Sequence, residues 1–310
     1  MKPKRTWRPL DGVLLFDKPL HLSSNDALQK VRRLFQAEKA GHTGTLDPLA
    51  TGLLPICFGE ATKFSSGLLD ADKSYRARVK LGQTSSTGDA EGEITVTGAA
   101  LPDESQVREA LRNFLGEIDQ VPPMHSALKH QGKPLYEYIR KGETVERAAR
   151  RVTIHELMLE SFARDEMEIS VRCSKGTYIR TLGEDIGRAL GCGAHLLALR
   201  RTAIAHLGLA QAHTWEQLEA QDMPGRDACL LPVDSLLKDL PELLLDAVQA
   251  RRLAQGQRLA VETGLPDGRV RLYCGQEFIG VAELQGRRLA PGRLLSGVAR
   301  TAASKSGIAE

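Results

Sequence analysis

Several patterns that identify common enzyme classes are missing from this 310-residue chain. Its five cysteines are scattered, with no C-x-x-C pair and no spacing typical of metal ligands, so we expect reduced thiols and no disulfide framework. The chain contains no H-E-x-x-H, no G-x-x-x-x-G-K-[ST], no G-x-S-x-G and no G-x-G-x-x-G after a strand. These absences argue against zinc-peptidase, P-loop, α/β-hydrolase and dinucleotide-binding chemistry. We expect no metal and no cofactor.

Long apolar runs are also missing. The segment GVLLF near the start is too short for a signal peptide and ends in Asp17-Lys18, and no stretch approaches the length of a membrane span. The net charge of +3 is too small to indicate a nucleic-acid partner by itself. We therefore expect a soluble cytoplasmic protein without a membrane partner, long enough for one large domain and a small one.

Hydrophobic periodicity predicts both strands and helices along most of the chain. Ser24 is predicted to cap a helix with Leu28, Val31 and Leu34 on its apolar face. Further helices are predicted after the capping box of residues 103–106, over 176–191 and around 244–253. Strands are predicted at 12–16, 74–81, 94–98, 151–162, 167–173, 269–273 and 278–283, and residues 194–209 form another helix or strand. The fold class that we predict is α+β, with a mixed, largely antiparallel sheet.

The segment 41–64, GHTGTLDPLATGLLPICFGEATKF, shows neither helical nor strand periodicity. Four glycines and two prolines predict sharp backbone turns around a single aspartate, Asp47. Asp47 followed by Pro48 is typical of a helix cap with proline at the first helical position, which predicts a short turn through Ala50. A carboxylate at such a turn is either a site or only a cap.

Residues 122–152 differ in composition from the rest of the chain. They contain seven Lys or Arg against three Glu, with little apolar periodicity, which predicts an insertion that stands off the core. Charge alone does not separate a solvated surface segment from one that binds phosphates. The basic residues available for phosphate contacts are Lys129, Lys133, Arg140, Arg147, Arg150 and Arg151.

Segment 41–64 resembles the signature of the TruB-type tRNA pseudouridine synthases, which isomerise uridine 55 in the T loop of tRNA. Five further blocks occur in the family order: Asp17-Lys18-Pro19, the K-x-Y…LG strand from Lys73 to Gly82, VPPMHSALKHQG, CSKGTYIRTLGEDIG and AHLLALRRT. The resemblance covers residues 10–210 and implies the pseudouridine-synthase fold for residues 1–242, including the basic insertion. Residues 243–310 resemble more loosely the PUA-like RNA-binding domain, a small β domain. Ser85-Ser86-Thr87, in place of a segment that usually carries an aspartate, and Ala205, in place of glycine, are departures that affect turn details.

The resemblance assigns the catalytic roles. Asp47 matches the nucleophilic aspartate, Tyr75 the tyrosine that stacks on the target base, and Arg180 the arginine that pairs with the aspartate. Without the resemblance, the ordinary interpretation of each residue is structural: a helix cap for Asp47, a packing residue for Tyr75 and one partner of a surface ion pair for Arg180.

The resemblance also implies five substrate-binding residues. His42 matches the position associated with base flipping, Tyr178 and Leu199 match substrate contacts, and Lys18 and Lys63 match basic residues near the site. Their ordinary alternatives are a backbone hydrogen bond for His42, core packing for Leu199 and a helix end for Lys63.

Pseudouridine formation breaks the N1–C1′ bond, turns the base and rejoins it through C5, so it requires no cofactor. The sequence does not decide whether the carboxylate adds to the base or to the sugar. The implied partner is the T-arm stem-loop of tRNA, with no obligate protein partner. An alternative from another class is a non-catalytic RNA-binding or tRNA-folding protein on the same scaffold, in which Asp47 is structural.

Overall fold

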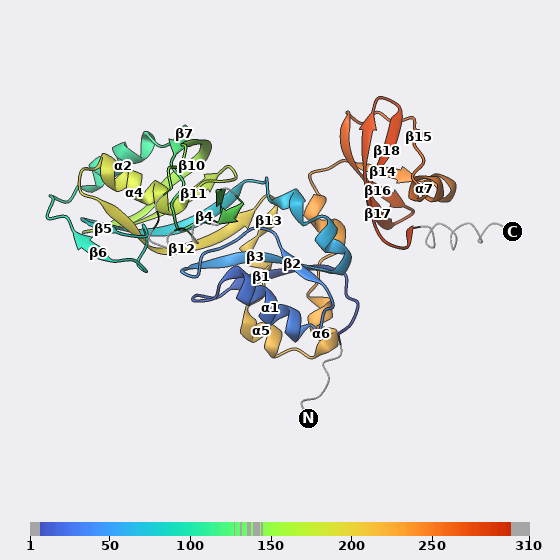
Figure 1. The fold of residues 1–310 in the computed structure, drawn as a ribbon, viewed down its shortest axis with the longest axis horizontal. Helices are drawn as coiled ribbons and strands as arrows, with labels where there is room; N and C mark the ends of the chain where they lie inside the picture. The colour runs from blue at the N-terminus through green and yellow to red at the C-terminus, as the bar shows by residue number, and fades with distance from the viewer. Residues whose placement is uncertain are drawn as a thin grey trace.

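The computed structural model describes residues 7–126, 128–130, 132–134, 138, 143 and 145–298. Most of the chain forms one sheet, in which the strand order is β1-β3-β12-β4-β11-β10-β7, with β2 paired to β3 and β13 paired to β12 (Figure 1). Its strands are β1 (Gly12–Lys18), β2 (Ala40–His42), β3 (Ala50–Phe58), β4 (Lys73–Leu81), β7 (Gly116–Gln120), β10 (Arg150–Ala163), β11 (Glu166–Cys173), β12 (Ala194–Ile204) and β13 (Leu207–Gly208). Neighbouring strands pair antiparallel except β3 and β12, so the predicted mixed, largely antiparallel sheet is confirmed.

Helices cover the sheet in two groups. Figure 1 shows α2 and α4 over the part of the sheet around β4, β12 and β10, and α1, α5 and α6 below β1 and β3. The α-helices of this part are α1 (Ser24–Leu34), α2 (Glu104–Arg112), α4 (Ile179–Ala189), α5 (Trp215–Glu219) and α6 (Met223–Ala228), and the 3-10 helices are η1 (Gly59–Lys63), η2 (Ser65–Leu68), η3 (Leu209–Gln211) and η4 (Val233–Leu237). None of the helices in the described ranges is both long and apolar enough to cross a bilayer.

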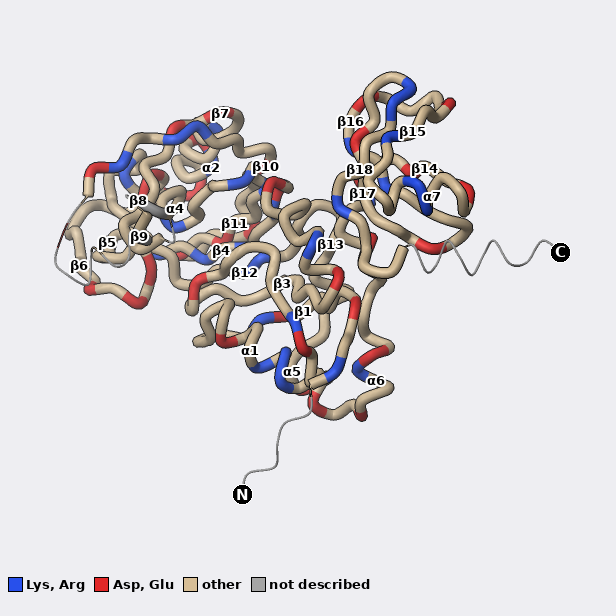
Figure 2. Tube along the Cα trace, turned by 45° about the vertical axis from the view of Figure 1, so that its right-hand side comes forward, with Lys and Arg blue, Asp and Glu red and all other residues tan. Residues whose placement is uncertain are grey.

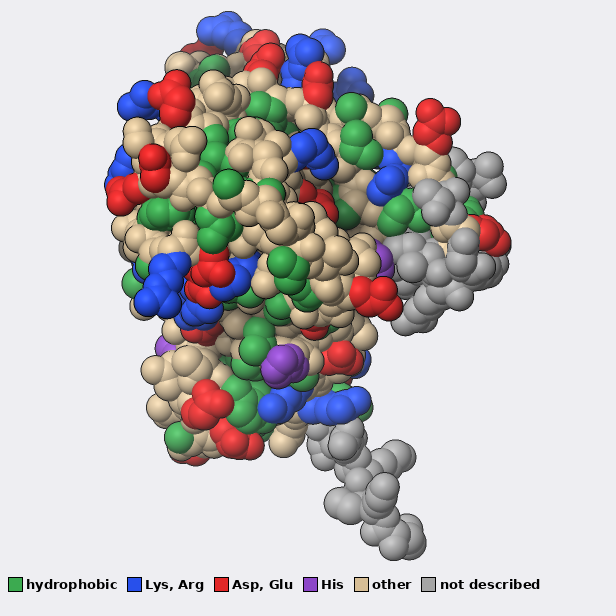
Figure 3. Space-filling view, turned by 90° about the vertical axis from the view of Figure 1, so that its left-hand side faces the viewer, with side chains coloured by type: hydrophobic (Ala, Val, Ile, Leu, Met, Phe, Trp, Pro, Cys, Tyr) green, Lys and Arg blue, Asp and Glu red, His purple; other side chains and the backbone are tan. Residues whose placement is uncertain are grey.

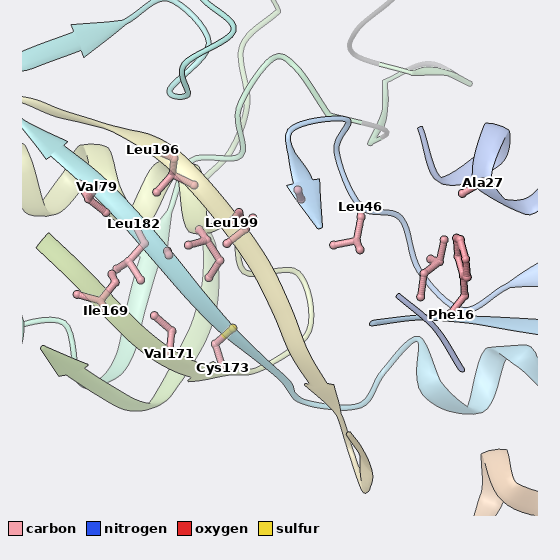
Figure 4. Packing of buried hydrophobic residues seen from close by; sticks show 14 of the residues in the cluster. Phe16, Ala27, Leu46, Val79, Ile169, Val171, Cys173, Leu182, Leu196 and Leu199 are labelled. Carbon is pink, nitrogen blue, oxygen red and sulfur yellow. The ribbon is translucent and has the colours of Figure 1, made fainter. Parts of the chain in front are cut away.

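The core follows the predicted helical face of α4. Leu182, in the middle of that face, packs in one buried cluster with Val79 of β4, Ile169 of β11 and Leu196 of β12 (Figure 4). All four side chains are completely buried. Residues 194–204 form a strand rather than a helix, because they pair with β4 on one side and with β3 on the other.

The parallel pair β3–β12 joins two antiparallel halves of the sheet. Leu199, Arg200 and Arg201 of β12 lie opposite Ala50, Thr51 and Gly52 of β3. Gly52 has φ +101°, and a Cβ there would overlap the main chain of Arg201. Glycine is therefore required for this close approach, which brings the turn before β3 next to the middle of β12.

The structure corrects the prediction for residues 41–64. Nearly every residue of β3 is buried, so this central strand is a continuous apolar run without the alternation that identifies a half-exposed strand. The predicted short turn through Ala50 is present, since the Ala50 N–H donates to the Asp47 carbonyl at 3.0 Å, but no helix follows Asp47 because the chain passes directly into β3. The prediction that Ser24 caps α1 is also wrong, since the cap is Ser23, whose side chain accepts from the Asp26 N–H.

Two hairpins lie outside the main sheet. β5 (Gln83–Ser85) pairs with β6 (Ile94–Val96), and β8 (Lys129–His130) pairs with β9 (Lys133–Pro134). The second hairpin belongs to the predicted insertion, but the insertion ends earlier than predicted because residues 150–152 are part of β10. Arg140 lies outside the described residues.

The C-terminal segment forms a separate sheet in the order β14-β16-β17-β18-β15 (Figure 1). Its elements are β14 (Glu242–Leu245), α7 (Ala247–Ala254), β15 (Leu259–Ala260), β16 (Gly268–Cys274), β17 (Glu277–Gln285) and β18 (Arg288–Leu294). The predicted helix and the two predicted strands correspond to α7, β16 and β17. The predicted domain boundary at residue 242 stays a prediction.

Phe64 and Lys63, which follow β3 in the chain, contact the C-terminal sheet, and we call this contact the clasp. The Phe64 ring contacts the Phe278 ring edge to face at 5.5 Å. Lys63 Nζ donates to the Leu294 carbonyl at 3.2 Å and to Ser296 Oγ at 2.9 Å. Phe64 also shares a buried apolar cluster with residues of β17, so the two sheets have a common core at this contact.

Candidate active site

Asp47 lies at the junction between the two halves of the main sheet. The turn that carries it precedes Ala50, which pairs with Leu199 of β12, and Leu199 in turn pairs with Ala77 of β4. Tyr75 lies two residues before Ala77 on β4. The helix α4 begins on the other side of Asp47, with Arg180 in its first turn.

Arg180 is held from several sides although its side chain is only 6% exposed. Its Nη2 is 3.0 Å from Asp47 Oδ2 and donates to the His125 carbonyl at 2.6 Å. Its Nη1 donates to the Thr87 carbonyl at 3.2 Å and lies 3.7 Å from Asp89 Oδ2. The planar guanidinium therefore has a fixed direction, and one edge of it faces Asp47.

Asp89 is a second carboxylate at the site that the sequence analysis did not single out. It is 3% exposed. Its Oδ1 accepts from the Thr87 hydroxyl at 2.6 Å and from the Glu91 N–H at 3.1 Å, while its Oδ2 faces Arg180. A buried carboxylate needs such partners. The glycine-flanked G-D-A-E-G turn was the available sequence signal, but the residues of an ordinary turn look the same.

Five of the predicted residues line one small cavity of about 140 Å³. They are Asp47, Tyr75, Tyr178, Arg180 and Leu199. The cavity thus combines a carboxylate, a guanidinium, two aromatic rings and an apolar side chain. Figure 4 shows Leu199 on β12 and Leu46 on the loop beside it, both of which contribute to this wall.

A second cavity of about 480 Å³ adjoins the first and shares Asp47 and Arg180 with it. The predicted residue His42 lines this outer cavity, together with Asp89 and His125. The Nδ1 atom of His42 is buried and has no hydrogen-bond partner among the described residues. Burial and the nearby Arg201 charge lower the pKa of His42 below its ordinary value, which favours the neutral imidazole at pH 7.

Opposing effects act on the pKa of the Asp47 carboxyl. Burial raises the pKa of the Asp47 carboxyl and the Asp89 charge raises it further, whereas the charges of Arg180 and Lys18 lower it. The Asp47 side chain is 41% exposed to the cavities. A ligand that covered the carboxylate would exclude solvent and raise the pKa of Asp47 further, so the ion pair with Arg180 matters most when the site is occupied.

Tyr75 has a buried cation beside it. Burial raises the pKa of the Tyr75 phenol, and the Arg201 guanidinium opposes that rise. Arg201 is 2% exposed and donates to the Leu53 carbonyl at 2.8 Å. The phenol therefore stays neutral at pH 7, and its ring is available for stacking.

The two predicted lysines are not placed in either cavity wall. Lys18 is completely buried behind the turn, where its Nζ donates to the Pro19 and Leu22 carbonyls at 2.9 and 2.7 Å. Burial lowers the pKa of Lys18 to about 8, and Asp47 opposes this shift. Lys63 belongs to the clasp with the C-terminal sheet, so its contacts give it a structural role at that junction.

Gln120 is another residue that the sequence analysis did not single out. It is 1% exposed at the end of β7, where its amide accepts from the Tyr178 N–H at 3.0 Å and donates to the Tyr178 carbonyl at 3.3 Å. Tyr178 is the N-cap of α4 and has no side-chain cap of its own. Gln120 therefore fixes the start of the helix that carries Arg180. No cluster of His, Cys, Asp and Glu in the described part of the chain could hold a metal ion.

Comparisons with known proteins identify the family. Three family models match: the TruB family pseudouridylate synthase N-terminal domain over residues 32–179, the tRNA pseudouridylate synthase B C-terminal domain over 180–238, and the pseudouridine synthase II TruB C-terminal model over 241–295. The chain belongs to the TruB family of pseudouridine synthases. The resemblance found in the sequence is thereby confirmed.

Relatives match this TruB-family chain over nearly their whole length. A protein of Burkholderia mallei described as tRNA pseudouridine synthase B is 56% identical over 301 residues, covering 95% of this chain and 97% of the relative. A protein of Cupriavidus taiwanensis with the same description is 57% identical over 304 residues, covering 94% and 96%.

Solved structures support the fold. An archaeal box H/ACA sRNP Nop10–Cbf5 complex contains a chain with TM-score 0.69 and 23% identity, which covers 92% of this chain and 86% of that one. An H/ACA RNP bound to a substrate RNA containing 2′-deoxyuridine gives TM-score 0.70 and 21% identity, with 95% and 90% coverage. The predicted pseudouridine-synthase fold is therefore confirmed.

Proposed function

We propose that this protein isomerises uridine 55 in the T loop of tRNA to pseudouridine in the cytoplasm, with Asp47 as the nucleophile. The observation that carries the proposal is the small cavity in which Asp47, Arg180 and Tyr75 meet. Its family supports the isomerase activity. The required partner is the T-arm stem-loop, and the reaction needs no second protein.

The cavity suits a reaction in which a base is detached and reattached. The N1–C1′ bond breaks and a C5–C1′ bond forms, while the C5 proton leaves and N1 gains a proton, so nothing is oxidised or reduced. The Asp47 carboxylate makes the detachment possible by adding to the base or to the sugar. Arg180 holds this carboxylate by a charge-assisted contact at 3.0 Å. Leu199 and the tyrosine rings keep the detached base inside the cavity.

The target uridine must leave its stack to reach the cavity. Extruding a nucleotide costs roughly a few kcal/mol, and stacking on an aromatic ring such as Tyr75 returns about 1–3 kcal/mol per base. His42 lines the wall of the outer cavity, and we assign it the role of filling the position that the base vacates. An RNA loop suits this site because its bases are already splayed out.

The test is the substitution Asp47→Ala, with Asp47→Asn beside it. We expect both variants to lose isomerisation completely, measured as release of tritium from C5-labelled uridine in a T-arm hairpin and in whole tRNA. The dissociation constant for tRNA should change by no more than a few-fold, because the carboxylate contributes to chemistry and little to phosphate binding. Asp165→Asn is a matched control, since Asp165 forms a surface ion pair with Lys80 at 2.8 Å, far along the sheet.

Two results would reject the proposal. Tritium release by Asp47→Ala at the wild-type rate would leave Asp47 as a structural residue. A wild-type protein that binds tRNA but releases no tritium would instead support the non-catalytic RNA-binding alternative.

A further inference from the structure

Ser24 is free for a role other than helix capping, because Ser23 caps α1. Ser24 is 2% exposed at the first position of α1. Its hydroxyl donates to the Leu46 carbonyl at 3.0 Å and accepts from the Leu46 N–H at 2.7 Å. One oxygen atom therefore satisfies both main-chain groups of the residue that precedes Asp47.

Other hydrogen bonds hold the loop on either side of Leu46: the Thr43 N–H donates to the Pro55 carbonyl at 3.2 Å and the His21 N–H to the Pro48 carbonyl at 2.9 Å. Among the described residues, no other hydrogen bond is formed by the Leu46 N–H or carbonyl. The Leu46 side chain is 4% exposed and packs in the main core, as Figure 4 shows. Earlier in the loop, Arg201 reaches the Gly44 and Thr45 carbonyls only at 3.4 and 3.5 Å, which is the weak end of the hydrogen-bond range.

Asp47 depends on this loop because its own carboxylate has few partners. Its ion pair is with Arg180, which belongs to the other half of the sheet. The direction of the carboxylate toward the small cavity is thus set by the main chain at Leu46 on one side and by the turn at Pro48 on the other. A displacement of about 1 Å at a reacting group can cost about 100-fold in rate.

We propose that Ser24 is a positioning residue for the isomerisation: its hydroxyl holds the Leu46 main chain and so aims the Asp47 carboxylate at the target nucleotide. This inference rests on the proposed function of Asp47. It assigns α1, which otherwise serves as packing, a direct connection to the chemistry. Ser24 also lines the outer cavity, next to the loop that it holds.

The experiment compares Ser24→Ala, Ser24→Thr and the wild-type protein in single-turnover tritium release from a T-arm hairpin. We expect Ser24→Ala to lower the rate about 10- to 100-fold while the hairpin dissociation constant changes less than threefold. Ser24→Thr retains a hydroxyl and should recover the rate to within about threefold of wild type. In Ser24→Ala the acid limb of the pH–rate profile should move to higher pH, because a carboxylate that drifts from Arg180 is protonated more easily.

A stability control separates positioning from folding. Thr214→Ala removes the N-cap of α5, where the Thr214 hydroxyl accepts from the Gln217 N–H at 3.3 Å, and it should lower Tm by a few degrees. Its rate and its pH profile should match those of wild type. If Ser24→Ala retains the wild-type rate and pH profile, or shows no more change than Thr214→Ala, the inference is wrong. If Ser24→Thr does not fold, which its Tm would reveal, the comparison of the two alanine variants decides.

Failure of this inference is distinguishable from failure of the proposed function. An active wild type, an inactive Asp47→Ala and a fully active Ser24→Ala would reject only the role of Ser24. An inactive wild type would reject the function itself.

Discussion

Asp47 comes from the half of the main sheet built on β1, β2 and β3, whereas Arg180 comes from the half that contains β12, β4, β11, β10 and β7. In the first half, Asp47 is held through the main chain. The Ser24 hydroxyl binds both main-chain groups of Leu46, and the Ala50 N–H donates to the Asp47 carbonyl. In the second half, Arg180 is held through its side chain, which donates to two main-chain carbonyls and lies next to the Asp89 carboxylate. Arg180 is 6% exposed and Asp47 is 41% exposed.

This difference fits the tasks that we propose for the two groups, with Asp47 as the nucleophile and Arg180 as the cation that orients it. A nucleophile must reach a substrate, so its carboxylate has to remain accessible and only its backbone can be restrained. A guanidinium that orients the nucleophile never leaves its place, so it can be bound on every side. The site therefore combines a rigid cation with an accessible anion, and each variant below disturbs one member of this arrangement.

The largest effect is expected for Arg180→Lys. Lysine keeps the charge, but its single nitrogen cannot occupy the two positions from which Arg180 Nη1 donates to the Thr87 carbonyl and Nη2 contacts Asp47 and the His125 carbonyl. We expect the single-turnover rate to fall by about 1000-fold, of the order seen when one preorganised donor is removed, with tRNA affinity within a few-fold of wild type. Arg188→Lys, at an exposed position of the same helix, is the matched control. A rate within tenfold of wild type would show that charge alone suffices.

A smaller effect is expected for Asp89→Asn. The rate should fall about 10- to 100-fold, because Arg180 loses one of the groups that orient it. The Asp89 charge raises the pKa of Asp47, so its removal should lower that pKa. Activity is lost as the pH falls through the pKa of Asp47, and the acid limb of the pH–rate profile should therefore move to lower pH. A limb that stays in place or moves upward would contradict the electrostatic role of Asp89.

The smallest effect is expected for substitutions on β10, at Arg150 and Arg151, and it concerns the affinity for tRNA. Arg150 lies opposite Gln120 in the β10–β7 pair and so on the same face as the site, whereas Arg151 lies opposite Asp119 on the other face. Arg151 is within 3.6 Å of Glu117 and of Asp119, and Figure 2 shows basic and acidic segments side by side near β7 and β10. Acidic neighbours thus partly neutralise Arg151.

We expect Arg150→Glu to weaken tRNA binding about tenfold and to reduce the slope of log Kd against log salt by about one. Arg151→Glu should change the affinity less than threefold. A salt titration of both variants measures the difference, and equal effects would show that both faces contact RNA. Figure 3 shows basic and acidic side chains interspersed on one face of the molecule. RNA binding through a few individual arginines is more consistent with this face than binding through one extended basic patch.

Periodicity was sufficient for the half-solvated strands and the helices but not for β3. β4 and α4 were predicted because one side of each is solvated, and their apolar residues alternate or repeat accordingly. β3 was missed because it is buried on both faces and contains Pro55. The departure at Ala205 does concern a turn, as predicted, since Ala205 has φ +49°, a conformation that favours glycine.

The grouping of the site residues came from family resemblance and not from spacing. Nothing in the sequence interval between Asp47 and Arg180 indicates that they meet, because their proximity depends on the parallel pairing of β3 with β12. Adjacent serines at 23 and 24 are equally good caps by composition, and only the path of the loop at Leu46 distinguishes them. Lys63 matches a basic position near the site in the family, but here β3 separates it in the chain from Asp47, and its Nζ contacts the C-terminal sheet.

The clasp at Phe64 and Lys63 restricts which RNAs could contact both the Asp47 cavity and the C-terminal sheet. Since β3, Phe64 and β17 share one apolar core, this contact sets where the C-terminal sheet lies relative to the Asp47 cavity. Any RNA that touches both must present its reactive nucleotide at that one separation.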